Sequence, residues 1–129
     1  MSALARVTLS RRADVYVAAL VGEVDMFNVE DVREQVLAGL PNTALGLVLD
    51  LSATTYLDST GVRLVFDLAE RLRSRQQQLR LAVPERSLPR RTLSLTGVDQ
   101  AVPVHEAVEE AIEPLLGTPG REGDDAPRP

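Results

Sequence analysis

The sequence predicts one α/β (α+β) domain, in which a mixed β-sheet of four to five strands carries about four helices. The 129 residues, 44% hydrophobic and 26% charged, suit a single folded core. Segments with strand patterns alternate with segments of helical spacing, which favours a partly parallel sheet. Residues 45–51 are almost continuously apolar, as in a strand that helices cover on both faces.

Two strands open the chain. Alternation and β-branched residues over Leu4–Leu9 and Val15–Val21 predict a strand pair joined around residues 12–14. Apolar residues then recur at helical spacing from Val29 to Leu40, so a first helix is expected there, with Asn28 in the capping position.

The central strand at residues 45–51 is followed by a polar stretch, residues 52–58, which we interpret as a loop. A second helix should start at Ser59 or Thr60. Its expected buried stripe consists of Val62, Val65, Phe66, Ala69 and Leu72.

The last third of the chain predicts a strand at Leu79–Val83, a short helix at Arg86–Leu95 closed by Gly97, and a final helix at Ala107–Leu116. In the final helix, Val108, Ala111, Ile112 and Leu115 are expected to face inward. The domain should therefore span residues 1–116, and residues 117–129, rich in Pro, Gly and acidic residues, are predicted to form a disordered tail.

Composition excludes several classes of chemistry. The fourteen basic residues are all Arg, there is no Cys, and His105 is the single histidine. The chain therefore lacks a Walker A lysine, zinc-finger or iron–sulfur ligands and a catalytic thiol, and we expect no metal and no cofactor. The net charge of −5 and only four aromatic residues argue against nucleic acid as a partner.

The longest apolar run, residues 15–22, is far shorter than the roughly 20 residues of a membrane-spanning helix, so no membrane insertion is expected. No leader pattern is visible, which favours a cytoplasmic location. Residues 63–91 carry a local excess of about five positive charges, which would suit either an acidic partner or a solvated face.

The most informative segment runs from Leu49 to Gly61, where the central strand leads through the polar stretch into the second helix. Asp58, Ser59 and Thr60 are residue types that cap helices by accepting hydrogen bonds from free backbone N–H groups. Capping alone would explain them. A helix N-terminus also favours anions, so the same residues are compatible with a site that holds a phosphate.

This segment resembles the STAS domain, and within that family the small bacterial anti-sigma-factor antagonists. The resemblance rests on a strand ending in Asp-Leu-Ser, a short loop, and Asp-Ser-Thr-Gly opening a helix at Asp58. Further matches are Gly-Glu-Val-Asp at residues 22–25, the strand at residues 79–84 and the segment at residues 93–98. Together they cover about residues 4–116.

The resemblance implies that the domain binds an anti-sigma factor that is also a serine kinase with a histidine-kinase-like ATPase fold. Phosphorylation at Ser59, or as second choice at Thr60, would switch that binding off and so control release of a sigma factor. A phosphatase would reverse it, and ATP and magnesium would belong to the kinase. The candidate partner-binding residues are Asp25, Asn28, Asp58, Ser59, Thr60, Gly61 and Arg63.

Two other functions stay open. Similar domains serve as small subunits of lipid-transport ATPases or sit in stress-signalling scaffolds. A hydrolase that uses Asp58 and Ser59 is the remote alternative. It lacks the Gly-x-Ser-x-Gly spacing, because residue 57 is Leu, and its only imidazole base, His105, is expected as a surface cap of the last helix. We therefore expect a protein that is not an enzyme and has no catalytic residues.

Overall fold

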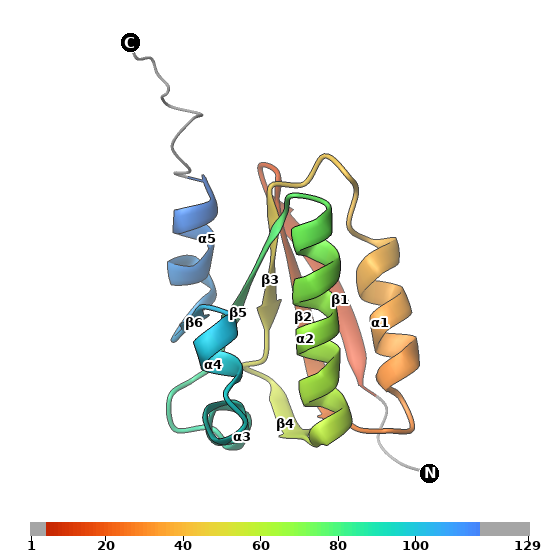
Figure 1. Cartoon of the computed structure of the whole chain (residues 1–129), viewed down its shortest axis with the longest axis vertical. Coiled ribbons are helices and arrows are strands. Elements are labelled where there is room, and N and C mark those ends of the chain that lie inside the picture. Colours follow the sequence, from red (N-terminus) through yellow and green to blue (C-terminus); the bar gives the residue numbers. More distant parts are fainter. Residues whose placement is uncertain (1–4, 117–129) are drawn as a thin grey trace.

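The computed structural model describes residues 5–116, which form a mixed six-stranded sheet with helices on both faces (Figure 1). The elements in chain order are β1 (Arg6–Arg12), β2 (Val15–Val24), α1 (Val29–Ala38), β3 (Gly46–Asp50), β4 (Thr54–Leu57), α2 (Ser59–Ser74), β5 (Gln78–Ala82), α3 (Leu88–Leu95), α4 (Val98–Ala101), β6 (Val104–His105) and α5 (Val108–Leu116). Leu4 and the predicted tail at residues 117–129 lie outside the described residues.

The main path of the sheet runs β1-β2-β3-β5-β6, with β4 attached separately to β2. Only β1 and β2 are antiparallel, and they form the predicted strand pair, joined by a turn in which Ala13 has φ 52°. The other described pairs, β2–β3, β2–β4, β3–β5 and β5–β6, are parallel. The central position predicted for the apolar strand is confirmed by β3, which lies between β2 and β5.

The strand β2 changes partner along its length, and this positions the start of α2. Residues 15–19 pair with β3, whereas residues 22–24 pair with β4 after a register shift between Gly22 and Glu23. Gly22 has φ 108°, a conformation that a residue with a Cβ rarely adopts. As a result, Leu57 lies opposite Val24, so α2 begins beside the connection from β2 to α1.

The interpretation of residues 52–58 as a loop is wrong, because they contain β4. Two buried side chains anchor this short strand. The Thr54 hydroxyl donates to the Leu20 carbonyl oxygen at 2.6 Å, and Leu57 packs in the main core. The polar residues of this segment do not show the pattern of a strand. The strand β4 is stabilised by pairing with β2, which the local sequence does not indicate.

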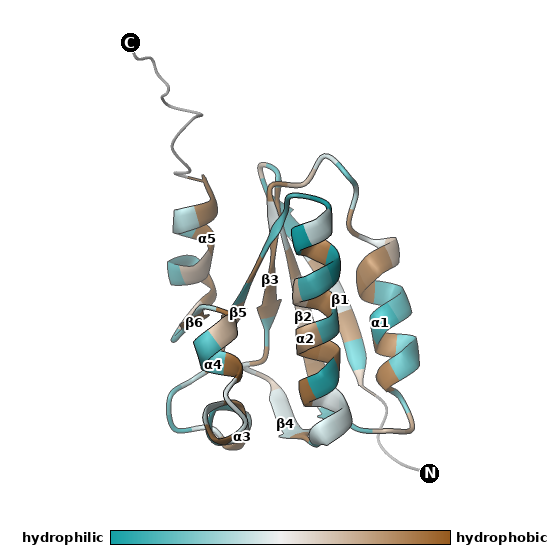
Figure 2. Cartoon of the chain, in the orientation of Figure 1, coloured by the Kyte–Doolittle hydropathy of each residue, from teal (hydrophilic) through white to brown (hydrophobic). Residues whose placement is uncertain are grey.

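Two apolar cores lie on opposite faces of the sheet. The larger one fills the space between the sheet and the helices α1 to α4, and it includes Leu47 and Leu49 of β3. In the smaller one, Val48 and neighbouring strand residues pack against Ala111, Ile112 and Leu115 of α5. Figure 2 shows β3 as mostly hydrophobic, beside helices in which hydrophobic and hydrophilic residues alternate. Helices therefore cover β3 on both faces, as predicted.

The buried face of α2 is rotated relative to the predicted stripe. Val62, Val65 and Leu72 are buried as expected, but Phe66 is 39% exposed and Ala69 is half-buried. Leu64 and Leu68 occupy the core in their place. Both sets of residues satisfy helical spacing, and contact with the sheet selects the leucines.

The prediction for His105 is also wrong. It belongs to β6, a two-residue strand paired with β5, and α5 starts three residues later. Its Nε2 lies 3.1 Å from the guanidinium of Arg80. Partial burial, reinforced by the charge of Arg80, lowers the pKa of His105 below its ordinary value. The described residues hold five helices instead of about four, because α4 follows Gly97, whose φ is 82°.

Candidate functional site

The start of α2 is capped by Asp58, whose Oδ1 accepts hydrogen bonds from the backbone N–H groups of Thr60 at 3.0 Å and Gly61 at 3.2 Å. Two of the donors that a helix leaves free at its N-terminus are thereby satisfied. The sequence predicted this capping role correctly, and it holds the adjacent residue, Ser59, in the first position of the helix.

The two hydroxyls beside this cap are in different states. The Thr60 hydroxyl donates to Asp58 Oδ1 at 2.5 Å, and Thr60 is half-buried. Ser59 is exposed, and within residues 5–116 its hydroxyl has no hydrogen-bond partner. The Ser59 hydroxyl is therefore free to act as a nucleophile toward a group that another protein presents, whereas the Thr60 hydroxyl would first have to give up its bond to Asp58.

Gly61 allows the first turn of α2 to approach β4 and β2. A Cβ on this residue would lie 2.5 Å from Leu57 Cδ1 and 3.4 Å from Val24 Cγ1. Gly61 is itself buried, so it contributes close packing that seats the helix start against the strands. Its side of the motif faces the core.

The connection between β2 and α1 lies next to this helix start. Asp58 N donates to the Val24 carbonyl oxygen at 3.4 Å, and Asp25 follows Val24 directly. The Asp25 carboxylate accepts a hydrogen bond from Phe27 N at 2.9 Å and so folds the connection into a turn. Asp25 is half-buried, and one of its carboxylate oxygens is engaged within the turn.

Asn28 supports this turn from within. Its amide accepts a hydrogen bond from Asp25 N at 3.0 Å and donates one to the Glu23 carbonyl oxygen at 2.8 Å. It occupies the N-cap position of α1, but its side chain makes no capping bond, so the predicted capping interaction is wrong. With only 5% of its surface exposed, Asn28 positions the turn and offers little to a partner.

Exposed apolar side chains gather around Ser59. We call this region the Ser59 end: the 25–28 turn, β4 and the first two turns of α2, all at the lower end of Figure 1. Within the described residues, the large apolar side chains exposed at this end are Met26, Phe27, Tyr56 and Phe66, and the helix α3 exposes two more, Leu88 and Leu95. Phe27 is 80% exposed. Surface patches of this kind mark sites of protein contact.

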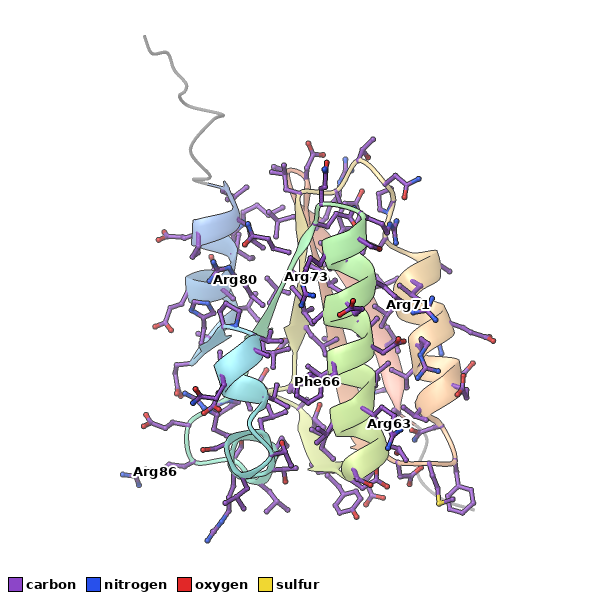
Figure 3. All side chains as sticks on the ribbon, viewed as in Figure 1. Arg63, Phe66, Arg71, Arg73, Arg80 and Arg86 are labelled. Carbon is purple, nitrogen blue, oxygen red and sulfur yellow. The ribbon has the colours of Figure 1, made fainter. Side chains whose placement is uncertain are left out.

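Free cations share this region. Most arginines in residues 5–116 have a hydrogen-bond or ion-pair partner, such as Arg33 with Asp67 and Arg73 with Glu70. The side chains in that range without one are Arg6, Arg63, Arg86 and Arg91. Figure 3 shows Arg63 on the side of α2 that faces α1, and Phe66 on the opposite side. The surface around Ser59 therefore combines exposed apolar groups with unpaired positive charge.

Within residues 5–116, no imidazole contacts Ser59. The single imidazole of the chain, that of His105 in β6, contacts Arg80 in β5 and not Ser59. Over residues 5–116, no cluster of three His, Cys, Asp or Glu side chains could hold a metal ion. In the same range, no helix is long and apolar enough to cross a membrane.

Sequence reasoning missed the exposed apolar residues that surround Ser59. Tyr56 lies in the segment interpreted as a loop, and Met26 and Phe27 lie between the second predicted strand and the first predicted helix, where a large apolar side chain has no predicted core to enter. Large apolar residues outside the predicted helices and strands were therefore the sequence feature that could have indicated this surface. Leu88 and Leu95 belong to a helix that was predicted, and only its packing reveals that they face outward.

Comparisons with known proteins agree with this architecture. A model of the STAS domain family matches residues 6–111. The anti-sigma-F factor antagonist RsfB of Mycobacterium tuberculosis is 26% identical over 112 residues, which cover 86% of this chain and 89% of RsfB.

Solved structures share the fold. An anti-sigma factor antagonist from Mycobacterium paratuberculosis superposes with a TM-score of 0.79 at 24% identity, covering 90% of this chain and 99% of that one. The phosphorylated form of SpoIIAA, a Bacillus cell fate determinant, superposes with a TM-score of 0.63 at 22% identity, covering 84% and 97%.

Proposed function

The chain belongs to the STAS domain family, and from that premise we propose that it is an anti-sigma-factor antagonist whose binding to an anti-sigma factor is controlled by phosphorylation of Ser59. The observation that carries the proposal is the free, exposed Ser59 hydroxyl at a capped helix start, beside exposed apolar groups and the unpaired Arg63. The similarity to RsfB supports the same class of partner.

The unphosphorylated surface is suited to docking. Phe27, Tyr56 and Phe66 flank Ser59 and would bury apolar surface against the anti-sigma factor. Arg63, four residues after Ser59 on α2, lies one helical turn away and would face acidic groups of the partner. Asp58 and Asn28 act indirectly, because their hydrogen bonds hold the two segments that carry these groups.

Phosphorylation converts this surface by charge alone. The kinase, with its own ATP and magnesium, transfers the γ-phosphoryl group to Ser59 Oγ, the hydroxyl proton leaves to a base of the kinase, and ADP is released. The phosphoserine carries close to two negative charges at neutral pH. Because Asp58 already caps the helix through Thr60 and Gly61, the helix start stays formed. The solved structure of SpoIIAA in a phosphorylated form, which shares this fold, supports a domain that stays folded when phosphorylated.

The magnitude of the charge effect is sufficient for a switch. A phosphate about 4 Å from an acidic group of the partner, at an effective permittivity near 20, costs about 4 kcal/mol for each unit of charge. That corresponds to roughly three decades in affinity. Removal of the phosphate by a phosphatase would restore binding. The protein would thus be a regulator of protein association and not a catalyst.

Phosphopeptide mapping tests the proposal. The purified chain is incubated with each histidine-kinase-like anti-sigma factor of the source genome, together with ATP and magnesium, and the products are analysed by tandem mass spectrometry. We expect one phosphate on Ser59, lost in Ser59→Ala and retained in the matched variant Thr60→Val. A phosphate outside residues 58–61, or no transfer and no complex with any of these proteins, would overturn the proposal.

A further inference from the structure

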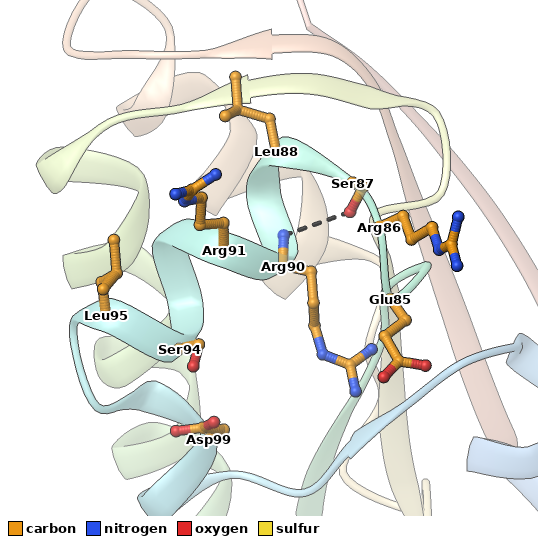
Figure 4. Close-up of a pocket in the computed structure, with 9 residues that line it drawn as sticks. All are labelled: Glu85, Arg86, Ser87, Leu88, Arg90, Arg91, Ser94, Leu95 and Asp99. Carbon is orange, nitrogen blue, oxygen red and sulfur yellow. Dashed lines mark hydrogen bonds between the residues drawn. The ribbon is translucent and has the colours of Figure 1, made fainter.

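The helix α3 exposes an apolar stripe that nothing in the described residues covers. Leu88 and Leu95 are seven residues apart, so they lie on the same face, and they are 56% and 79% exposed. The opposite face of the helix enters the main core through Leu93. Figure 4 shows Leu88, Arg91 and Leu95 along α3. The stripe thus has the spacing with which one helix packs against another.

Positive charge frames this stripe. Arg91 lies between the two leucines in sequence, and Arg86 lies just before the helix. Neither side chain has a hydrogen-bond or ion-pair partner within residues 5–116. Arg90, by contrast, donates to the Val83 carbonyl oxygen at 2.5 Å. Arg86 and Arg91 border the same surface hollow as Leu88 and Leu95 (Figure 4).

We propose that α3 is a second docking site, one that takes an acidic amphipathic helix of a protein partner through Leu88, Leu95, Arg86 and Arg91. Leucines of the incoming helix would pack between Leu88 and Leu95, and its flanking carboxylates would pair with the two arginines. The two turns of α3 match two to three turns of a partner helix in length. The site uses neither Ser59 nor its cap, so it adds to the proposed function without depending on it.

Charge argues against other occupants. A second copy of this chain would present the same hollow, in which the cations Arg86, Arg90 and Arg91 outnumber the carboxylates Glu85 and Asp99, so two such surfaces would repel each other. An anionic membrane would meet the carboxylates of Glu85 and Asp99, which border the same hollow. A partner helix can place its own charges to suit both, because its side chains vary along the axis.

The test uses a designed probe. The full-length ¹⁵N-labelled chain is titrated with a three-heptad peptide that carries Leu at a and d, Glu at e and g, and Ala or Gln elsewhere, and the backbone amides are followed by NMR. We expect saturable shifts centred on α3 with a dissociation constant below 1 mM, and weaker binding at 300 mM than at 50 mM salt. A peptide with Lys in place of Glu should bind at least tenfold more weakly.

Variants localise the effect. Both Leu88→Ser with Leu95→Ser and Arg86→Glu with Arg91→Glu should weaken binding at least tenfold, and amide spectra verify that each variant is folded. Arg73→Glu, an exposed charge reversal far along α2, is the matched control and should bind like the wild type. Ser59→Asp should also bind like the wild type, so a failure of this inference is distinguishable from a failure of the phosphorylation switch.

Several outcomes would overturn the inference: no saturable shifts in α3, equal binding of the Glu and Lys peptides, or binding that survives the leucine substitutions. Dimerisation in sedimentation that Leu88→Ser with Leu95→Ser abolishes would assign the stripe to a second copy instead. Co-sedimentation with 3:1 phosphatidylcholine:phosphatidylglycerol vesicles that requires the same leucines would assign it to a membrane.

Discussion

The two ends of α2 differ in how many of their polar side chains are hydrogen-bonded within the protein. At its C-terminal end, Arg75 donates to Asn42 Oδ1 at 2.6 Å and to the Leu40 carbonyl oxygen at 3.2 Å. Gln77, just beyond, donates to the carbonyl oxygens of Pro41 and Ala44 at 3.0 and 3.1 Å. We call this region, residues 39–45 with residues 75–77, the Gln77 end. Its polar side chains tie the connections of the fold together.

The Ser59 end leaves comparable groups unused. The Ser59 hydroxyl and the Arg63 guanidinium have no partner within residues 5–116, and Phe27 is largely exposed. Leu9, which among residues 5–116 is the large apolar side chain exposed away from both this end and α3, lies in β1 against Gly39. The helix α2 therefore connects a region whose polar side chains are hydrogen-bonded within the fold with a region whose exposed groups are free to contact a second protein. The difference predicts that substitutions at the two ends affect different measurements.

The largest effect should come from phosphorylation itself. Stoichiometric phosphate on Ser59 should weaken binding to the cognate anti-sigma factor by about 4 kcal/mol, roughly a thousandfold, for each unit of charge that meets an acidic group. Isothermal titration calorimetry on the phosphorylated and unphosphorylated chains measures it. Ser59→Asp, with a single charge, should give a smaller loss in the same direction. Equal affinity of the two forms would remove the contrast between the ends.

The second largest effect should come from substitution of the exposed aromatic residue Phe27. Phe27→Ser should cost about 2 kcal/mol of binding to the anti-sigma factor, the scale of a buried aromatic at an interface. Because the side chain is exposed in the free protein, the free energy of unfolding should change by no more than about 0.5 kcal/mol. Calorimetry and urea denaturation report the two quantities separately. A stability loss without a binding loss would place Phe27 in the fold and not in the interface.

The Gln77 end should show the reverse pattern. Gln77→Ala removes the donor to two carbonyl oxygens at a buried position, so it should lower the free energy of unfolding by about 1 to 3 kcal/mol. Affinity for the anti-sigma factor, measured on the folded protein, should not change. If this variant weakened binding as much as Phe27→Ser does, the functional division between the ends would be wrong.

Removal of the helix cap at Asp58 should change both the stability of the protein and the site of phosphorylation. Asp58→Ala should lower the free energy of unfolding by about 1 kcal/mol, since two helix N–H groups lose their acceptor. It also frees the Thr60 hydroxyl from its bond to Asp58, so phosphate should appear on Thr60 as well as Ser59. Urea denaturation and phosphopeptide mapping check the two results. Phosphate on Ser59 alone would show that the kinase, not this hydrogen bond, selects the residue.

The smallest effect should be a pH dependence from β6. Burial and Arg80 lower the pKa of His105 in the folded state, so the unfolded chain binds the proton more readily. Stability from this group is therefore complete above the ordinary histidine pKa near 6.5 and falls as the pH decreases through that value. Urea denaturation between pH 7.5 and 5.5 should show a slope that is reduced in His105→Gln. Binding at the Ser59 end should be unaffected by this substitution.

Local sequence was a sound guide wherever one element had a single way to bury itself. The continuous run over β3 could only be a strand between two layers, and Asp58-Ser59-Thr60 could only open a helix. The alternation in β1 and β2 likewise led to the correct pair. In each of these cases the periodicity and the capping chemistry act within one element, so no distant partner is needed to interpret them.

Tertiary structure decided what depended on a distant partner. On α2, helical spacing allowed either Phe66 with Ala69 or Leu64 with Leu68 to face inward, and the sheet chose the leucines. The strand β4 exists because the end of β2 is available to pair with it. The different states of Ser59 and Thr60 became visible only once the Asp58 carboxylate was oriented. A sequence records which side chains can be buried or bonded, whereas the neighbours that bury or bond them are assembled only by the fold.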